Sequence, residues 1–177
     1  MARSLVTKQN LNRNPIDVAF RFLTYRPRSE SEVRRRLSRQ FTMMQVDDTI
    51  DKLRERGILD DSAFANFWCS NREQHRPRSK MMLNQELRSF GVSGTIAKEA
   101  LNMIDDETSA LNAGRRYGRR LSTADQQGFY KKMMNHLHRR GFGFLLTQKV
   151  ARDIWNELSC PADSDIYGNT KEQQPKN

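Results

Sequence analysis

The sequence is poor in cysteine, because its 177 residues include only Cys69 and Cys160. The separation of these two residues fits no metal-binding or redox motif, which excludes a disulfide-stapled scaffold and a cysteine zinc site. We therefore expect no metal or other cofactor, a reducing cytoplasmic setting, and Cys69 as a small side chain that faces the core.

Long apolar runs are missing too, since no stretch approaches the roughly 20 residues that cross a bilayer. The start of the chain has no apolar segment typical of a secretory signal. It carries no acidic residue before Asp17, so a transit peptide stays open as an alternative to a polar tail over residues 1–14. Residues 159–177 are rich in polar and turn-forming residues, and we expect a second flexible tail there.

The alternation of apolar and polar residues that is typical of strands is almost absent between these tails. Apolar residues recur instead at spacings of three and four, which is the period of amphipathic helices. The sequence therefore predicts an all-α fold of about nine short helices. None of them can bury its apolar face alone, so neighbouring helices must stack.

What the chain does contain is a repeated tetrapeptide, Arg-Pro-Arg-Ser, at residues 26–29 and again at 76–79. Pro27 and Pro77 end one helix, because the residue before a proline is pushed out of helical geometry. Ser29 and Ser79 then cap the next helix, and Glu32 completes a capping box in the first copy only. A repeat at a spacing of 50 residues indicates a copied structural unit, and repeat proteins usually work through their surfaces.

The repeat predicts tandem three-helix units in an elongated, curved array. We expect apolar helix faces to be buried within each unit, including Phe20, Phe67, Trp68, Met103, Phe142 and Trp155. The predicted segments are a tail over 1–14, repeat 1 over 15–59, repeat 2 over 60–104, repeat 3 over 105–158, and a tail over 159–177.

The residues that could carry catalysis have a simpler structural interpretation. The carboxylate pairs Asp47-Asp48, Asp60-Asp61 and Asp105-Asp106 fall at predicted helix starts, where acids cap free N–H groups. His136 and His138 are two residues apart on a helix and cannot share a metal. No nucleophile–base pair or glycine-rich phosphate loop is present. We therefore expect no enzyme; a nuclease is the least favoured alternative.

Positive charge dominates the sequence. The formal net charge is +10, and arginine supplies 22 of the 31 basic residues. Such a surplus predicts an anionic partner, and arginine favours forked contacts to phosphate or carboxylate. Some of these residues stand at the Arg-Pro-Arg corners and others form like-charged rows on helices. The predicted partner- or DNA-binding residues are Arg26, Arg28, Arg34, Arg35, Arg39, Arg72, Arg76, Arg78, Arg115, Arg116, Arg119, Arg120, Lys131, Lys132, Arg139 and Arg140.

Several segments together resemble the RecX family of regulatory proteins over about residues 16–158. The first resembles the first-repeat signature of that family and is Leu23-Thr24-Tyr25-Arg26-Pro27-Arg28-Ser29 with Glu32, Val33 and Leu37. The segments that resemble the second repeat are Gly57-Ile58-Leu59-Asp60-Asp61, Phe64-Ala65, Trp68, Arg72, Arg78-Ser79, Glu86-Leu87 and Gly91-Val92-Ser93. Arg139-Arg140-Gly141-Phe142 resembles the third-repeat signature.

The resemblance implies tandem three-helix repeats and a non-catalytic regulator that binds the RecA recombinase. It implies that the protein lies along the groove of the RecA filament and inhibits ATP hydrolysis and strand exchange, which modulates recombination, DNA repair and the SOS response. We expect a monomer, with single- or double-stranded DNA as a further partner of the basic surface. The alternative from the residues themselves is a stand-alone basic helical module that binds DNA.

Overall fold

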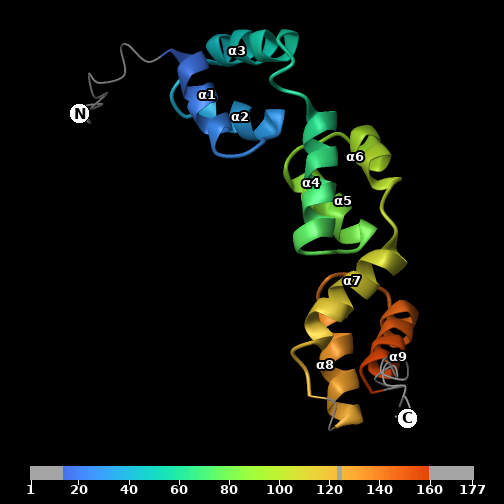
Figure 1. Cartoon of the computed structure of the whole chain (residues 1–177). Coiled ribbons are helices and arrows are strands. Elements are labelled where there is room, and N and C mark those ends of the chain that lie inside the picture. The colour runs from blue at the N-terminus through green and yellow to red at the C-terminus, as the bar shows by residue number, and fades with distance from the viewer. Residues whose placement is uncertain (1–13, 123–124, 160–177) are drawn as a thin grey trace, which may run out of the picture.

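The computed structural model describes residues 14–122 and 125–159. Within these ranges the chain forms nine α-helices and no strand. The helices follow one another as three groups of three, and the groups succeed each other along an elongated, bent array with the first and the last group at opposite ends (Figure 1). The prediction of an all-α array of tandem three-helix units is therefore confirmed.

Unit one consists of three capped helices. They are α1 (Pro15–Thr24), α2 (Glu30–Leu37) and α3 (Met43–Glu55). The side chain of Asn14 accepts from the backbone N–H of Ile16, and Ser29 forms the predicted capping box with Glu32. The core of the unit consists of Ala19, Val33, Leu37, Val46, Ile50, Leu53 and Leu59.

Units two and three repeat this plan. Unit two contains α4 (Asp61–His75), α5 (Lys80–Ser89) and α6 (Gly94–Leu101), and unit three contains α7 (Asp106–Gly118), α8 (Gln126–His138) and α9 (Phe144–Ser159). Each unit has its own apolar core, drawn from residues 64–104 and 110–154 respectively. We propose that the unit boundaries fall at 59/60 and 104/105, between one core and the next.

The buried faces differ from prediction at three positions. Phe20 is 39% exposed because α1 turns Ala19, Val18 and Phe22 toward its neighbours instead. Phe67 is 42% exposed. Met103 is 88% exposed because α6 ends at residue 101, so helical spacing does not continue to residue 103.

The other expected core residues are found inside. Cys69 and Phe142 are buried, and the two tryptophans are half-buried against their cores. Burial is the largest cause that raises the pKa of the Cys69 thiol to about 11, followed by the charges of Glu73 and Glu86.

The prediction that Asp47 and Asp48 begin a helix is wrong. Helix α3 begins one turn earlier, because Thr42 caps it and Gln45 completes a capping box. Asp47 and Asp48 therefore lie inside the helix, where they pair with Arg34 and Lys52. Asp60 and Asp105 do cap helices, as predicted.

The Arg-Pro-Arg-Ser segments form the joints between units. At the first joint the hydroxyl of Ser29 donates to the carbonyl of Phe90 at 2.6 Å. The backbone N–H of Glu30 donates to Asp61 Oδ1 at 2.9 Å. Ser29 thus caps its own helix and holds the end of α5, while Asp61 of unit two caps a helix of unit one.

The second joint uses the same plan fifty residues later. The backbone N–H of Ser79 donates to the carbonyl of Arg140 at 3.1 Å, and that of Lys80 donates to Asp106 Oδ1 at 2.7 Å. The C-terminal end of α8 therefore meets the N-terminal end of α5, whose own C-terminal end meets the start of α2. Opposite partial charges of neighbouring helix ends face each other at both joints.

Unit three lacks the tetrapeptide, and its middle helix enters a joint only through its C-terminal end among the described residues. A joint joins the N-terminal end of one middle helix to the C-terminal end of the middle helix in the next unit. Within the described residues no unit follows α9, so the start of α8 receives no such end. Asp125 caps α8 instead, through the backbone N–H of Gly128.

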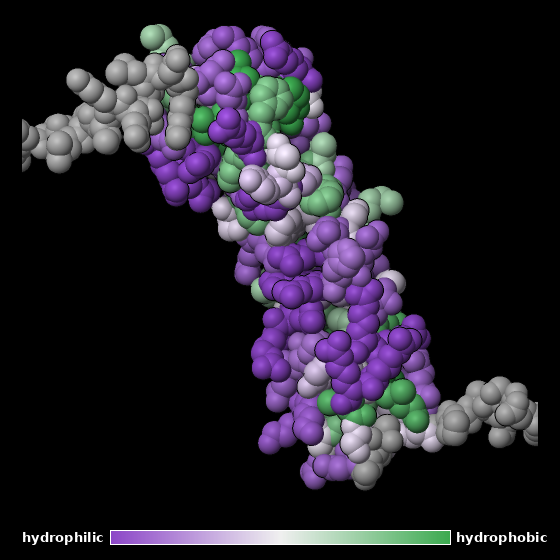
Figure 2. Space-filling view, turned by 60° about the vertical axis from the view of Figure 1, so that its left-hand side comes forward, coloured by the Kyte–Doolittle hydropathy of each residue, from purple (hydrophilic) through white to green (hydrophobic). Residues whose placement is uncertain are grey.

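The surface of the array is mostly polar. Figure 2 shows a face on which hydrophilic residues predominate and hydrophobic ones form small separate areas. Within residues 14–122 and 125–159, no helix combines the length and the apolar character that a bilayer crossing requires.

Candidate functional site

The sixteen predicted basic site residues fall into two groups, those that pair with carboxylates and those that do not. Six of them pair, and they do so mainly at the joints and along helix contacts. The paired residues are Arg26, Arg28, Arg34, Arg72, Arg78 and Arg115.

At the first Arg-Pro-Arg corner both arginines bind the same carboxylate, that of Glu32. Arg26 binds Glu32 at 2.6 Å and Arg28 binds it at 3.3 Å. The guanidinium of Arg26 also lies 6.0 Å from the ring of Trp68 and 5.7 Å from that of Phe90. These distances are within the range of cation–π attraction, so Arg26 links unit one to the aromatic side chains of unit two.

The second corner is only partly compensated, through Glu86. Arg78 binds Glu86 at 2.6 Å, Arg72 binds it at 2.9 Å, and the indole N–H of Trp68 donates to it at 2.7 Å. One carboxylate thus holds α4, α5 and the corner together. Arg76 has no ion-pair partner among the described residues, although it belongs to the same corner.

Of the four arginines at positions 115, 116, 119 and 120, only Arg115 pairs with a carboxylate among the described residues. Arg115 forms a bidentate pair with Glu157 of α9, with N–O distances of 3.0 and 2.7 Å. This pair offsets the positive charge of Arg115 beside Arg119, its neighbour four residues on. Arg116 and Arg120 remain exposed and make no ion pair within the described part of the chain.

The other predicted residues have no carboxylate partner among the described residues. They are Arg35, Arg39, Arg76, Arg116, Arg119, Arg120, Lys131, Lys132, Arg139 and Arg140. All are exposed except Arg140, which is half-buried.

Arg140 lies at the centre of a cluster that forms at the second joint. Its Nη1 donates to the carbonyl of Pro77 at 3.2 Å. Burial is the largest cause that lowers the pKa of its guanidinium, and the positive charges of Arg78, Arg76 and Arg116 lower it further. We call this cluster the basic joint; its members are Arg76, Arg78, Arg116, Arg120, Arg139, Arg140 and His136.

His136 is the one residue of the basic joint that stays neutral near pH 7. Its ring stacks on that of Tyr117 with centroids 3.9 Å apart, and its Nε2 accepts from Arg140 Nε at 2.9 Å. Burial lowers the pKa of His136 to about 4, and the charges of Arg140, Arg139 and Arg120 act in the same direction. The neutral ring therefore orients Arg140 without adding charge.

The two joints share a backbone plan but differ in charge. At the repeat spacing of 50 residues, Phe90 corresponds to Arg140 and Glu86 corresponds to His136. The first joint thus carries an aromatic ring where the second carries a guanidinium. Unit three has no carboxylate at the position that corresponds to Glu86, so the positive charge around Arg140 is not offset from that side.

The basic joint has the chemistry of an anion-binding surface. Arginines of the second corner, of the end of α7 and of the segment after α8 present forked donors, and Arg140 is held in place by two protein acceptors. A carboxylate cluster or a phosphodiester backbone would fit such donors. Within the described residues, no group of three or more histidine, cysteine or acidic side chains is placed to hold a metal ion.

Sequence reasoning missed the contribution of His136 and Glu86. His136 was considered only as a metal ligand, and Glu86 was not considered as a neutralising residue. A signal was available, because aligning Gly91 with Gly141 places Glu86 opposite His136. Such an alignment shows that unit three replaces an acid by a titratable base.

Comparison with known proteins shows which family this chain is similar to. Residues 16–53 match the first three-helix domain of RecX, and residues 60–101 match its second three-helix domain. A regulatory protein RecX of Prosthecochloris aestuarii is 36% identical over 137 residues, which cover 77% of this chain and 87% of that protein. The chain belongs to the RecX family. A second RecX family member, from Chlorobium phaeobacteroides, is 31% identical over 132 residues, or 74% of this chain and 87% of that protein.

Solved RecX structures have the same fold. The crystal structure of RecX from Lactobacillus salivarius superposes with a TM-score of 0.65 at 19% identity, covering 79% of this chain and 94% of that one. Another crystal structure, of a regulatory protein RecX, gives a TM-score of 0.64 at 20% identity, over 78% of this chain and 71% of that one. At these identities the likeness supports the fold.

Proposed function

We propose that this protein binds the RecA recombinase filament in the cytoplasm and inhibits its ATPase and strand-exchange activities, as a non-catalytic regulator. Membership of the RecX family of regulatory proteins is the observation that carries this proposal. Regulation of RecA in turn links the protein to recombination, DNA repair and the SOS response.

The shape and charge of the molecule support this assignment. An elongated array of three units can follow a filament groove and touch several protomers, so that individually weak contacts add up. The basic joint is the surface that we propose for the main contact. Arg140 is already oriented by Pro77 and His136, which reduces the entropy lost when an anion binds.

The second candidate is a stand-alone DNA-binding module, which the unpaired arginines of the basic joint favour. A helix-turn-helix protein normally concentrates its base-reading residues on one recognition helix. Here the unpaired basic residues lie in α2, α7 and α8 or in the segments that follow α2, α4, α7 and α8, which favours a spread contact surface. We therefore expect DNA contacts of this chain to be salt-sensitive and weakly selective for sequence.

A RecA ATPase assay on single-stranded DNA separates the two candidates. We expect ATP hydrolysis to fall when this protein is added, and the inhibition to weaken as salt is raised. The same DNA without recombinase provides the control for direct binding. Unchanged ATPase activity together with tight, sequence-selective binding to duplex DNA would favour the stand-alone module instead.

A further inference from the structure

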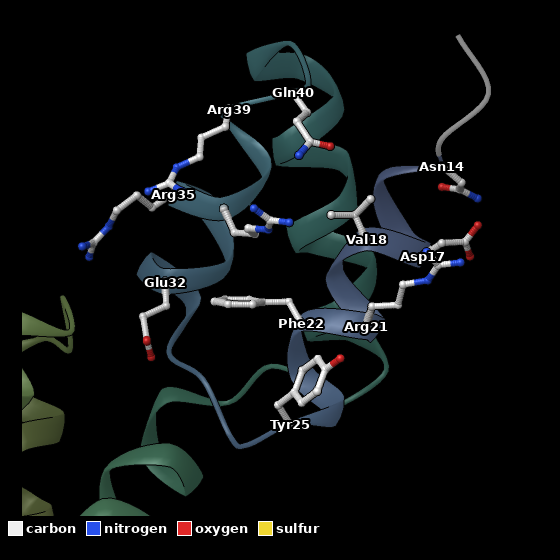
Figure 3. Close-up of a pocket in the computed structure, with 11 residues that line it drawn as sticks. Asn14, Asp17, Val18, Arg21, Phe22, Tyr25, Glu32, Arg35, Arg39 and Gln40 are labelled. Carbon is white, nitrogen blue, oxygen red and sulfur yellow. The ribbon is translucent and has the colours of Figure 1, made fainter. Parts of the chain in front are cut away.

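A groove between α1 and α2, remote in sequence from the basic joint, lies outside the contact surface proposed above. It encloses about 700 Å³ and is open to solvent. Figure 3 shows Val18 and Phe22 pointing from α1 toward α2, with Gln40 above them. The groove is lined by Asn14, Asp17, Val18, Arg21, Phe22, Tyr25, Glu32, Arg35, Arg36, Arg39 and Gln40.

The charge of the groove is positive and unbalanced. Its four arginines, Arg21, Arg35, Arg36 and Arg39, make no ion pair within the described residues. Of its two acids, Glu32 is already bound by Arg26 and Arg28 at the corner. The lining therefore holds four arginines and one carboxylate, that of Asp17, that make no ion pair among the described residues. The groove attracts an anionic ligand.

The floor of the groove is apolar. Val18 and Phe22 are half-buried against the core of unit one, and Arg28 lies 4.1 Å from the centre of the Phe22 ring. Tyr25 stands at the rim and is 85% exposed. An apolar side chain of a ligand could bury surface here, at about 25 cal/mol per Å² removed from water.

An unsatisfied acceptor lies at the upper end of the groove. Gln40 Oε1 is buried and receives no hydrogen bond among the described residues. A buried polar atom without a partner costs free energy, and rotation of the Gln40 amide toward the groove would let a ligand N–H recover it. The groove thus offers forked donors, an apolar floor and one acceptor that needs an N–H donor.

We propose that this groove binds an extended acidic segment of a partner protein that carries an apolar side chain between its carboxylates. The carboxylates pair with arginines of α1 and α2, the apolar side chain covers Phe22, and a backbone N–H of the segment donates to Gln40. This inference rests on the proposed function. It adds the class of protein segment that a second contact surface of the regulator would bind.

A nucleic-acid strand fits the groove less well. A phosphodiester backbone has no N–H that could donate to Gln40. The guanidinium of Arg28 already occupies one face of Phe22, which prevents a base from stacking there. A peptide satisfies all three features, since it supplies N–H donors, carboxylates and an apolar side chain.

Fluorescence anisotropy with the full chain tests this proposal. The probe is a labelled acidic peptide of about twelve residues with a central Leu-Phe pair, and its competitors are the same peptide with Ser-Ser at the centre and an oligothymidine. We expect Arg35→Gln with Arg39→Gln to weaken binding of the probe by at least about tenfold. The matched control, Arg56→Gln with Arg88→Gln, removes the same charge from exposed arginines outside the groove and should leave binding unchanged.

A second variant tests the acceptor separately from the charge. Gln40→Met keeps the length of the side chain and removes the unsatisfied oxygen, so it should not lower the free energy of unfolding. It should nevertheless weaken binding of the peptide, because the N–H of the ligand loses its acceptor. An effect on stability alone would overturn this part of the proposal.

Four results would overturn the proposal as a whole. The first is that the matched control loses as much binding as the groove variant, and the second is that the Ser-Ser peptide binds as tightly as the probe. The third is that oligothymidine displaces the probe with the same sensitivity to Arg35 and Arg39. The fourth is that the chain itself fills the groove. The last would appear as competition by a peptide of residues 160–177, or as self-association that the groove variant abolishes. No recombinase is present in this assay, so its failure is distinct from failure of the proposed function.

Discussion

Replacing Gly91 with alanine should disturb the joint between units one and two, whereas the same change at Gly57 should affect only local backbone energy. Both glycines follow a helix in left-handed backbone, with φ of 80° and 65° respectively. They differ in their surroundings. A Cβ at Gly57 would meet no atom within 4 Å, but a Cβ at Gly91 would overlap Cβ and Oγ of Ser31, in the helix that the joint holds.

The expected magnitudes follow from these two environments. A side chain in left-handed backbone costs about 1–2 kcal/mol, which applies to both positions. Ser31 Cβ is one bond from the backbone, so it cannot yield unless α2 or the corner shifts. Overpacking of this kind typically costs about 1–3 kcal/mol more. We therefore expect a loss of about 1–2 kcal/mol for Gly57→Ala and about 2–5 kcal/mol for Gly91→Ala.

Urea unfolding followed by circular dichroism measures this difference. Gly141→Ala provides an independent repeat of the test, because a Cβ there would overlap Met82 and lie 2.5 Å from Ser79 Oγ, the hydroxyl that caps α5. It should behave like Gly91→Ala. Equal losses for all three alanine variants would refute the assignment of Gly91 and Gly141 to inter-unit joints.

Two further predictions concern the charges near the second joint. The pKa of His136 is about 4 in the folded protein and about 6.5 in the unfolded chain, so the unfolded chain binds the extra proton as pH falls. The free energy of unfolding should therefore drop by about 2–3 kcal/mol between about pH 7 and pH 4.5, and His136→Phe should remove most of that drop in urea titrations. Glu86→Gln should destabilise the protein by about 1–3 kcal/mol, because it leaves Arg72 and Arg78 without their anion. The same variant should strengthen salt-sensitive binding to oligothymidine in anisotropy measurements, and no gain would show that those arginines do not reach the ligand.

Local sequence signals predicted much of the fold. Ser29 with Glu32, Ser79 in the second copy, and Asp60 each act within one helical turn, so the residues alone indicate the cap. Burial was less predictable at Phe20 and Met103. The face that a helix buries depends on which neighbours it meets and on where it ends, and neither is encoded within one turn.

The candidate site was harder to predict than the helices. The ion pair of Arg28 with Glu32 can be predicted, because the two residues are only four apart in the sequence. Arg115 and Glu157 are 42 residues apart and lie on different helices, so their ion pair cannot be predicted from spacing. Composition therefore gave the sign of the partner's charge without showing which arginines are free. The basic joint depends on contacts across a unit boundary, which only the three-dimensional arrangement reveals.

Inhibition of RecA ATPase by matched charge-reversal variants tests the central claim most directly. One variant combines Arg116→Glu, Arg120→Glu and Arg139→Glu in the basic joint. Its control combines Arg56→Glu, Arg88→Glu and Arg152→Glu at exposed positions elsewhere, and both variants carry a net charge of +4 in place of +10, because each substitution removes two units. With unchanged helical circular dichroism, we expect the first variant to lose at least about tenfold in inhibition and the control to retain most of it. Equal inhibition by the two variants would contradict the assignment of the basic joint as the contact surface.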